Sequence, residues 1–401
     1  MPLGPNLDTW LRAEISYNAP LTASTWVDIT SDIHGARMVT GRQGGDGGNF
    51  RPREIQFKLR NNSGQWDRDN SSSPHYNNLR KGMAMRLTFS DDLFATPHRL
   101  GRVYCTNIAI GHFNTHSGAV MTGQDLLSTS LGRFNVEELE RPAELTGTRV
   151  AAVLDHVGTP SALRDRIDSG TVMCPATTLN GNALSICQEM QRTEHGAFFC
   201  NNRGELVFLD RHTIYTDTDY STVNFDLTED HVSAADVVPS NFLDSQDVTE
   251  GSSSGVTGKV LTRGTTTANE IRIVRSINGT QAMYDGDVEA QAWAAGDGAI
   301  STVQALKEVT IKPISAPDLI SDQLMLSHFE PLTSLGVNLP FVGHASNYDV
   351  DHRIETVTHE MTEQDWTMKL GLSPYDTNRQ TRSDNWHEVG VANQTSGRPA
   401  E

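Results

Sequence analysis

Histidine, cysteine, serine and closely spaced acids are the residues of this chain that could carry out chemistry, and their spacing decides whether any of them forms a site. His112 and His116 lie four residues apart with Cys105 upstream, a spacing that could hold a metal ion. A structural zinc site needs a complete tetrahedral set of ligands, however, and a polar turn separates the two histidines. We therefore expect both histidines at the surface rather than on a metal.

The other cysteines and one serine motif are weaker candidates. Cys174, Cys187 and Cys200 recur every thirteen residues, which fits neither a zinc knuckle nor a zinc ribbon, so we expect buried apolar side chains. Because the chain has no C-x-x-C pair, a reduced protein without disulfides is expected. Ser253 lies in a Gly-x-Ser-x-Gly pattern like the nucleophile elbow of hydrolases, which needs a hydrophobic strand before it and a helix after it. Polar residues flank the motif on both sides, so the sequence predicts a loop.

Acidic pairs could act as calcium ligands or as a general acid and base, but their surroundings argue against both. Two of them give half of a calcium-binding loop each, without the glycine and the distant glutamate that complete it: Asp217-x-Asp219 and Asp349-x-Asp351. Solvated turns are expected there. Neighbouring acids occur at 91–92 and at 137–138. Adjacent side chains on a strand point to opposite faces, which is poor geometry for an acid–base pair.

Glycine and aromatic residues are the remaining candidates for a binding site. The run Gly41–Gly48 lacks the Lys-Ser/Thr of a phosphate-binding loop and contains an aspartate that would repel phosphate, so we expect a flexible hairpin tip. The aromatic positions favour a barrel core over a sugar-stacking platform: Trp26, Phe57, Phe89 and Trp366. The sequence therefore predicts no catalytic, cofactor-binding or metal-binding residue, no cofactor and no enzymatic activity.

Bulk composition limits the class of protein. At 401 residues the chain is too long for one ordinary core, so about two to four domains are expected. Its 33 glycines and 16 prolines imply many turns and favour short strands over long helices. The net charge of −18 opposes non-specific binding to nucleic acid or to anionic membrane. The N-terminus lacks the pattern of a signal peptide and no apolar window could span a bilayer, so we expect synthesis in the cytosol without membrane insertion.

Strands are the elements that must position these residues. Arg53–Arg60 alternates without interruption between apolar and polar side chains, which is typical of a strand with one buried and one wet face. The same pattern predicts strands at Met83–Phe89 and Trp366–Leu372, and further strands at Arg102–Cys105 and Ala119–Leu127. Residues up to about 140 should form one antiparallel, barrel-like unit, since the edges of such a sheet need closing or covering.

A different pattern begins near Arg141. Apolar residues at helical spacing predict one helix over Val150–Val157 and a second over Asn182–Gly196, followed by a hairpin over Ala197–Leu209. Block 141–215 should therefore be a small α/β module. Further on, Asn278-Gly279 predicts a hairpin turn.

The last third of the chain returns to strands. A short helix is expected over Ile300–Glu308, and strands are expected from Val309 onward. Past Tyr375 the chain has few apolar residues and no periodicity, which predicts disorder or a tail that depends on a partner.

Several motifs of the chain, in their order, carry a resemblance to a known family. Near the N-terminus these motifs are Trp26-Val27-Asp28-Ile29-Thr30 (a short strand), Gly41-Arg42, Asn61-x-x-Gly64, Asn70-x-x-Ser73-Pro74-x-Tyr76 and Leu79-x-x-Gly82. Near the C-terminus they are Ile354-Glu355-x-Val357-x-His359-Glu360-x-Thr362, Trp366 and Leu370-x-Leu372-Ser373-Pro374. Together they resemble the opening strands and the closing hairpin of the tail hub proteins of long-tailed bacteriophages, which are often labelled minor tail proteins.

The resemblance implies a mainly β fold, with two β-barrel-like domains and an inserted α/β module. The implied domains are the first barrel (1–140), the α/β module (141–215), the start of the second barrel (216–250), a second part of the protruding module (251–309), the remainder of the second barrel (310–375) and a polar tail (376–401).

The resemblance also implies a structural virion protein without enzymatic activity. Three chains would place six barrels in a ring at the distal end of the tail, match the six-fold tail tube to the three-fold tip and surround the DNA exit channel. The implied partners are further copies of the chain in a homotrimer, the distal tail protein, other tail-tip proteins and the tape measure protein. DNA would pass through the lumen without specific binding. The implied location is the virion tail tip, after assembly in the host bacterial cytoplasm.

Three alternatives stay open at this point. A distal tail protein, the hexameric adaptor between tube and hub, would have one barrel and an appended domain, which the signature at 354–374 argues against. A receptor- or carbohydrate-binding tail module would present aromatic clusters in loops. A tail-associated hydrolase would need paired carboxylates or a metal triad.

Overall fold

The fold is described from a computed structural model of the chain. It describes residues 11–18, 21, 25–42, 48–89, 98–113, 116–238, 247–253, 256–262, 273–280, 305–313, 330–340, 348–362 and 365–374. The predicted polar tail at 376–401 lies outside these residues.

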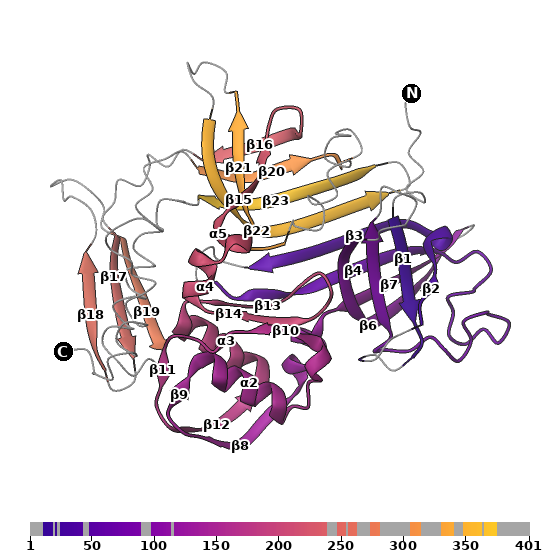
Figure 1. The fold of residues 1–401 in the computed structure, drawn as a ribbon. Helices are drawn as coiled ribbons and strands as arrows, with labels where there is room; N and C mark the ends of the chain where they lie inside the picture. Colours follow the sequence, from indigo (N-terminus) through magenta and orange to yellow (C-terminus); the bar gives the residue numbers. More distant parts are fainter. Residues whose placement is uncertain are drawn as a thin grey trace.

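Most strands belong to one sheet of thirteen strands (Figure 1). Its N-terminal half contains β1 (Leu11–Ser16), β2 (Val27–Asp28), β3 (Ile33–Arg42), β4 (Phe50–Arg60), β5 (Ala84–Phe89), β6 (His98–Phe113) and β7 (His116–Gln124). Its C-terminal half contains β15 (Val223–Leu227), β16 (Val232–Val238), β20 (Ala305–Ile311), β21 (Ser334–Leu339), β22 (Tyr348–Thr362) and β23 (Trp366–Pro374). The strand order is β16-β20-β23-β22-β3-β4-β7-β6-β5-β1-β2, with β21 on β22 and β15 on β21.

Alternating side chains explain why these segments are strands. In β4, Ile55, Phe57 and Leu59 are buried while Lys58 and Arg60 are exposed, as the sequence predicts. The same alternation between buried and less buried residues occurs in β23. The buried faces of both halves contribute to one hydrophobic core, which runs from β1 to β23.

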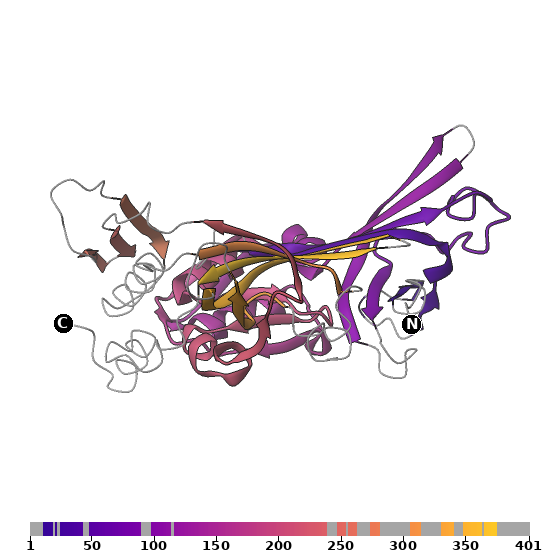
Figure 2. The same ribbon diagram turned by 90° about the horizontal axis from the view of Figure 1, so that it is seen from above.

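The two halves are joined by β3 and β22, which pair antiparallel from Gly35 opposite Thr362 to Gly41 opposite Thr356. Figure 2 shows the sheet nearly edge-on, as a curved layer with most of the helices on one side. Among the described strands, the β3–β22 pairing links the two predicted barrel-like sets into one hydrogen-bonded sheet. The predicted mainly β class with a smaller α/β portion is confirmed.

An α/β module lies between the two halves in sequence. Its helices are α1 (Leu126–Thr129), α2 (Thr146–His156), α3 (Ala183–Glu194), α4 (Arg211–Thr216) and α5 (Thr218–Ser221), with 3-10 turns η4 (Leu131–Arg133) and η5 (Ser161–Leu163). Its strands are β8 (Asn135–Arg141), β9 (Glu144–Leu145), β10 (Arg164–Ile167), β11 (Met173–Cys174), β12 (Thr177–Asn182), β13 (Ala197–Cys200) and β14 (Leu206–Leu209).

Local sequence signals set the ends of the two longer helices of this module. Asn182 caps α3 by accepting a hydrogen bond from the backbone N–H of Ser185, and His195 ends it with a left-handed φ of 55°. Gly158 follows α2 with a φ of 70°. The two helices and the hairpin predicted for this part of the chain are therefore confirmed.

Two segment predictions are wrong because tertiary pairing overrides local signals. The described part of the segment expected to be a helix, 305–308, belongs to β20, whose Val309 and Ile311 contribute to the apolar core of the large sheet. The expected turn at Asn278-Gly279 lies inside β19 (Ile273–Thr280). That strand pairs parallel with β17 (Asp247–Ser253), and a register shift between the two strands absorbs the dipeptide.

The remaining elements refine the predicted organisation. The short strand expected over 26–30 is β2 followed by the 3-10 turn η3 (Thr30–Asp32). Strands β17, β18 (Val256–Thr262) and β19 form a separate sheet. The predicted boundaries 250/251 and 309/310 fall inside β17 and β20. Within the described ranges, no helix has the length and apolar character to cross a membrane.

Candidate functional site

The histidines and the cysteine that suggested a metal do not converge. His112 and His116 lie at the end of the β6–β7 hairpin, where His112 pairs with Ser117 and Phe113 with His116. Cys105 is buried in the main core. Seven positions along the extended β6 separate Cys105 from His112, which corresponds to roughly 23 Å. In the described ranges, no group of three His, Cys, Asp or Glu residues could hold a metal ion.

All four cysteines are free and buried, as predicted for Cys174, Cys187 and Cys200. Burial raises the pKa of the Cys105 thiol to about 11 and that of Cys187 to about 12. It raises the pKa of Cys200 well above its ordinary value. A reactive cysteine needs a lowered pKa and access to solvent, so these thiols pack the core and do not act as nucleophiles.

The acidic pairs have structural roles. Asp217 caps α5 by accepting a hydrogen bond from the backbone N–H of Asp219 (3.0 Å) and forms an ion pair with Arg166 (2.6 Å). Asp349 and Asp351 lie on the same strand, β22, rather than in a turn. The acids at 91–92 lie outside the described residues.

Glu137 and Glu138 lie on β8, and both side chains are exposed. Glu138 has a φ of 50°, and its backbone N–H donates to Asn180 Oδ1 (2.8 Å). A bulge sets these two residues of β8 opposite one residue of β12 and so breaks the alternation of the strand.

The glycine run lies at a hairpin, as predicted, whereas the serine motif is placed differently from the prediction. Gly41 and Arg42 end β3, which pairs antiparallel with β4 as far as Arg42 opposite Phe50, and 43–47 lie outside the described residues. The segment around Ser253 belongs to β17 rather than to a loop, and strand β18 follows it instead of a helix. Neither segment therefore resembles a phosphate cradle or a nucleophile elbow.

The aromatic residues are mainly core, as predicted. Phe57, Phe89 and Trp366 are buried in the central cluster, with the rings of Phe89 and Trp366 5.3 Å apart. Trp26 differs, because it is partly exposed and the guanidinium of Arg86 lies 4.1 Å from its ring centre.

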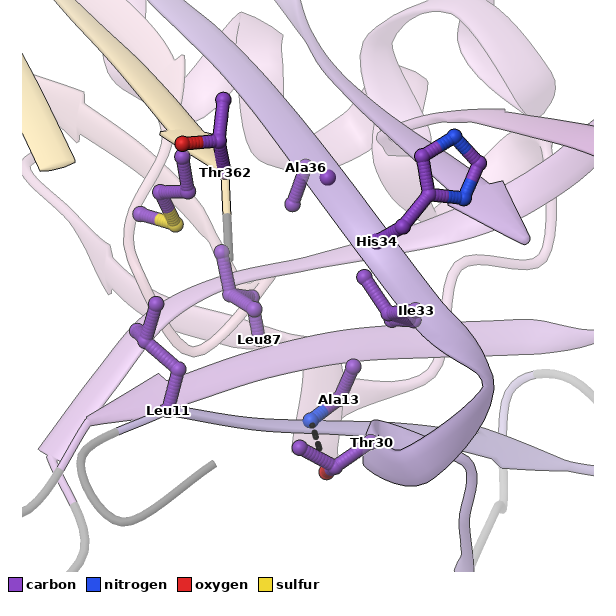
Figure 3. Close-up of a pocket in the computed structure, with 10 residues that line it drawn as sticks. Leu11, Ala13, Thr30, Ile33, His34, Ala36, Leu87 and Thr362 are labelled. Carbon is purple, nitrogen blue, oxygen red and sulfur yellow. Dashed lines mark hydrogen bonds between the residues drawn. The ribbon is translucent and has the colours of Figure 1, made fainter. Parts of the chain in front are cut away.

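A pocket opens where β1 faces β3, but its lining does not suggest catalysis (Figure 3). Its walls are formed by small or apolar residues together with two threonines and a histidine: Leu11, Ala13, Thr30, Ile33, His34, Gly35, Ala36, Leu87, Met361 and Thr362. Thr30 Oγ1 accepts a hydrogen bond from the backbone N–H of Ala13 (3.0 Å). His34 is the single titratable side chain of the lining, so this hollow has no acid–base pair.

Charged residues do converge at the junction of the two sheet halves with the α/β module. We call Arg42, Arg53 and Arg353 the arginine junction; they lie on β3, β4 and β22 and are at most 4% exposed. Buried arginines are rare unless their charge is paired. The hydrogen-bond and ion-pair partners of these three arginines therefore show which elements the junction connects.

Arg53 lies at the centre of the junction. Its guanidinium donates to the backbone carbonyls of Leu100 on β6 (2.9 Å) and Cys200 on β13 (3.4 Å). Its backbone N–H donates to Asp125 Oδ2 (2.7 Å), while Asp125 Oδ1 caps α1. Burial raises the pKa of Asp125 to about 6, although the Arg53 charge and backbone donors oppose the shift. Burial likewise raises the pKa of Glu330, whose carboxylate interacts with Arg53 and accepts from the backbone N–H of Asn202.

The two other arginines hold neighbouring elements. Arg42 forms a two-pronged ion pair with Glu355 of β22, and Ser373 of β23 also donates to that carboxylate (2.5 Å). Arg353 donates to the backbone carbonyl of Ile214 in α4 (3.4 Å) and lies over the Tyr215 ring. The arginine junction thus ties both halves of the sheet to the module.

Two buried histidines complete this region. His359 accepts a hydrogen bond from Trp366 Nε1 through Nδ1 (3.2 Å), and burial together with the Arg53 charge lowers its pKa to about 3. His352 contacts the Tyr348 hydroxyl (3.0 Å) and the Val350 carbonyl (2.9 Å), and burial lowers its pKa to about 4. Both imidazoles are therefore neutral at neutral pH and serve as hydrogen-bonding core residues.

The arginine junction and the two buried histidines can hold helices and strands in place, but they present no reacting group to a substrate. Asp125 is committed to a helix cap and Glu355 to Arg42 and Ser373. No motif in the sequence predicts the arginine junction, although Arg53 shares the strand face of Ile55 and Phe57, which is a usable signal of its burial.

Proteins that share this architecture are found by comparing structures but not by comparing sequences. Neither a protein-family sequence model nor a characterised protein sequence matches the chain. Among solved structures, the 43 kDa tail protein of prophage MuSo2 from Shewanella oneidensis matches with a TM-score of 0.57 at 12% identity, over 92% of this chain and 99% of that one. The tail protein from Neisseria meningitidis MC58 matches with a TM-score of 0.59 at 9% identity, over 95% and 99%.

The chain has the fold of phage tail proteins. A third example, prophage tail protein gp18 from Listeria monocytogenes EGD-e, matches with a TM-score of 0.51 at 10% identity, over 90% of this chain and 94% of that one. Since nearly the whole length is covered in all three cases, the tail-protein fold includes both sheet halves and the α/β module. At the level of phage tail proteins, the fold agrees with the resemblance found in the sequence.

Proposed function

We propose that this protein is a structural, non-enzymatic component of a phage tail, and specifically the homotrimeric hub at the distal end of the tail. The observation that carries the proposal is the match of the tail-protein fold over at least 90% of this chain. The site chemistry agrees with it, because the charged groups of the arginine junction are engaged in joining elements. In this role the protein surrounds the DNA exit channel of the virion.

The architecture suits a ring of three copies. One chain contributes two sheet halves of several strands each, joined rigidly at β3 and β22. Three such chains would place six halves around an axis and so match a three-fold tip to a six-fold tube. Distal tail protein, other tail-tip proteins and the tape measure protein are the proposed neighbours, and assembly takes place in the host bacterial cytoplasm.

The net charge of −18 supports passage of DNA without binding. If the carboxylates in excess partly line the channel, they repel the phosphates and let the duplex slide. The electrostatic potential inside an assembled ring tests this point, and a neutral or basic lumen would rule it out.

The mass of the purified protein in solution, measured by sedimentation velocity alone and then with tail-tube protein, tests the proposed hub. A trimer supports it. A hexamer would instead identify a distal tail protein, and a stable monomer under both conditions would favour a binding module or a hydrolase.

A further inference from the structure

The two halves of the large sheet repeat one another strand by strand. Along the chain, β1, β3, β4, β5, β6 and β7 correspond in order to β15, β16, β20, β21, β22 and β23. Across the sheet, the first set runs β3-β4-β7-β6-β5-β1 and the second runs β16-β20-β23-β22-β21-β15, so the spatial orders agree as well. The halves differ in that β1 pairs antiparallel with β5, whereas β15 pairs parallel with β21.

Bulges occur at the same places in both halves. In the two long hairpins, the pairing skips Thr106 of β6 and Glu355 of β22. In the outer strand pairs, it skips His34 of β3 and Ser233 of β16 in the same way. Because a bulge is a specific feature of a strand, these positions fix the correspondence of the halves residue by residue.

The junction within one chain uses the part of β22 that follows its bulge. Before the bulge β22 pairs with β21, and after it with β3, from Thr356 opposite Gly41 to Thr362 opposite Gly35. Before its own bulge, β6 likewise pairs with β5 as far as Tyr104. After the bulge, none of the described strands pairs with β6 on the side away from β7. Among the described strands, β16 pairs with β20 alone. These two open edges are therefore the counterparts of the edges that β22 and β3 join.

The open edge of β6 has the composition of a strand that pairs. Exposed sheet edges usually carry charges or proline that prevent pairing with another chain. The run Asn107–Phe113 contains no acid, lysine, arginine or proline. Ile108 and Ile110 are partly exposed, whereas their counterparts beside β3, Val357 and His359, are at most 1% exposed. Figure 2 shows the hairpin of β6 and β7, coloured purple, projecting from the rest of the sheet.

We propose that β6 of one copy pairs antiparallel with β16 of the next copy, and so repeats between chains the junction that β22 and β3 form within a chain. The inference rests on the proposed homotrimer and names the strands through which neighbouring copies join. The register of β22 and β3, transferred through the bulges, sets Ala109 opposite Val238 and Phe113 opposite Ala234. Two different edges then meet, which is a heterologous contact of the kind that closes a ring. Three copies join six sheet halves through six equivalent junctions.

Cross-linking of paired cysteines in the full chain tests this register. Residues directly opposite in an antiparallel pair have Cα atoms about 4.5–5.5 Å apart, a distance that a disulfide spans. On mild oxidation, a chain with Ala109→Cys and Val238→Cys should give covalent species up to a trimer on a non-reducing gel. The native cysteines are all buried, so they give no background.

Two matched variants check the chemistry and the register. Val39→Cys with Thr358→Cys puts the corresponding pair into the junction within one chain and should cross-link intramolecularly under the same conditions. Ala109→Cys with Ala234→Cys moves one thiol four residues along β16, which is roughly 13 Å, and should not cross-link.

A charge on the joined face tests the same contact without cysteines. Ile110→Lys would bury an ammonium group in the junction and should weaken self-association about tenfold or more in sedimentation velocity. Lys58→Glu, an exposed change on β4, is the control and should leave association unchanged. Circular dichroism shows whether Ile110→Lys is folded; if it is not, the cysteine pairs decide.

The outcomes separate the inference from the proposed function. If the wild type is a trimer and the 109/238 pair fails to cross-link while the 39/358 pair succeeds, the strand pairing is wrong although the hub proposal stands. A covalent ladder that continues beyond three chains supports the strand pairing and contradicts the three-fold hub. A wild type that is monomeric alone and with tube protein contradicts both.

Discussion

Arg53 shows how a charged residue can be more informative about a fold than its apolar neighbours. The alternation of β4 predicts the burial of Ile55 and Phe57, and Arg53 shares their face. The sequence does not reveal that the Arg53 guanidinium donates hydrogen bonds to backbone carbonyls of β6 and β13. Nor does it reveal that the charges of Asp125 and Glu330 interact with that of Arg53. These partners are distant in sequence, so local periodicity carries no signal for them.

Arg53→Met should lower the free energy of unfolding by about 3–5 kcal/mol, because it leaves the Asp125 and Glu330 carboxylates without their buried cation. Urea denaturation at pH 7 measures this loss. Lys58→Met on the exposed face of the same strand is the control and should change stability by less than about 0.5 kcal/mol. Equal effects of the two substitutions would contradict the role given to Arg53.

His359 should contribute to acid sensitivity. Its pKa is lowered to about 3 in the fold, so its stabilising effect is present above its ordinary value of 6.5 and is lost as the pH falls toward 3. His359→Gln keeps an acceptor for Trp366 and should reduce the slope of unfolding free energy against pH, between pH 4 and 6, by about 1.4 kcal/mol per pH unit. Urea midpoints at several pH values measure the slope.

Asp125 acts in the opposite direction. Because its pKa is raised to about 6, its contribution is present below the ordinary value of 3.8 and is lost as the pH rises through 6. The pH dependence of the wild-type unfolding free energy therefore combines the contributions of His359 and Asp125. If His359→Gln leaves the slope of unfolding free energy against pH unchanged, His359 is already charged in the folded protein.

At the scale of elements, the pair β3–β22 decides how the halves are joined. Sequence alternation predicts β4 and β23 well, since each has one buried face. It cannot predict that β3 pairs with a strand more than three hundred residues away, because register is fixed by close backbone approach. At Gly41, with a φ of 130°, an added Cβ would lie 2.3 Å from the Glu355 carbonyl oxygen.

Gly41→Ala should therefore lower the free energy of unfolding by about 3 kcal/mol or more, since it combines a strained φ with a backbone clash. Gly118→Ala is the matched control in the same sheet, because its added Cβ would lie 3.7 Å from the nearest atom, and it should change stability by less than about 1 kcal/mol. Thermal denaturation of both variants measures the difference. A Gly41 variant as stable as the control would mean that the β3–β22 contact relaxes easily.

At the scale of the whole molecule, the sequence predicts the mainly β class and the helical module, and the structure confirms both. The sequence does not predict that the two strand sets share one sheet and one core. This sharing depends on the pairing of β3 with β22, and alternation within a single strand carries no signal for its distant partner.

A shared core implies that the halves open together. Native-state hydrogen exchange should give the slowest amides of β4 and of β23 the same free energy of opening and the same dependence on urea. Mass spectrometry of peptides covering 54–59 and 366–372 measures both. Opening of one half at clearly lower urea than the other would show that the halves fold as independent units.

The covered thiols have a practical consequence for tracing this protein within larger particles. Since Cys105, Cys174, Cys187 and Cys200 are all buried, maleimide dyes have no native attachment point while the chain stays folded. A cysteine introduced at the exposed Asn107, on the hairpin arm formed by β6 and β7, would take up a single fluorophore with the wild-type background intact. Energy transfer between such labels could then follow the spacing of neighbouring copies as a tail is built.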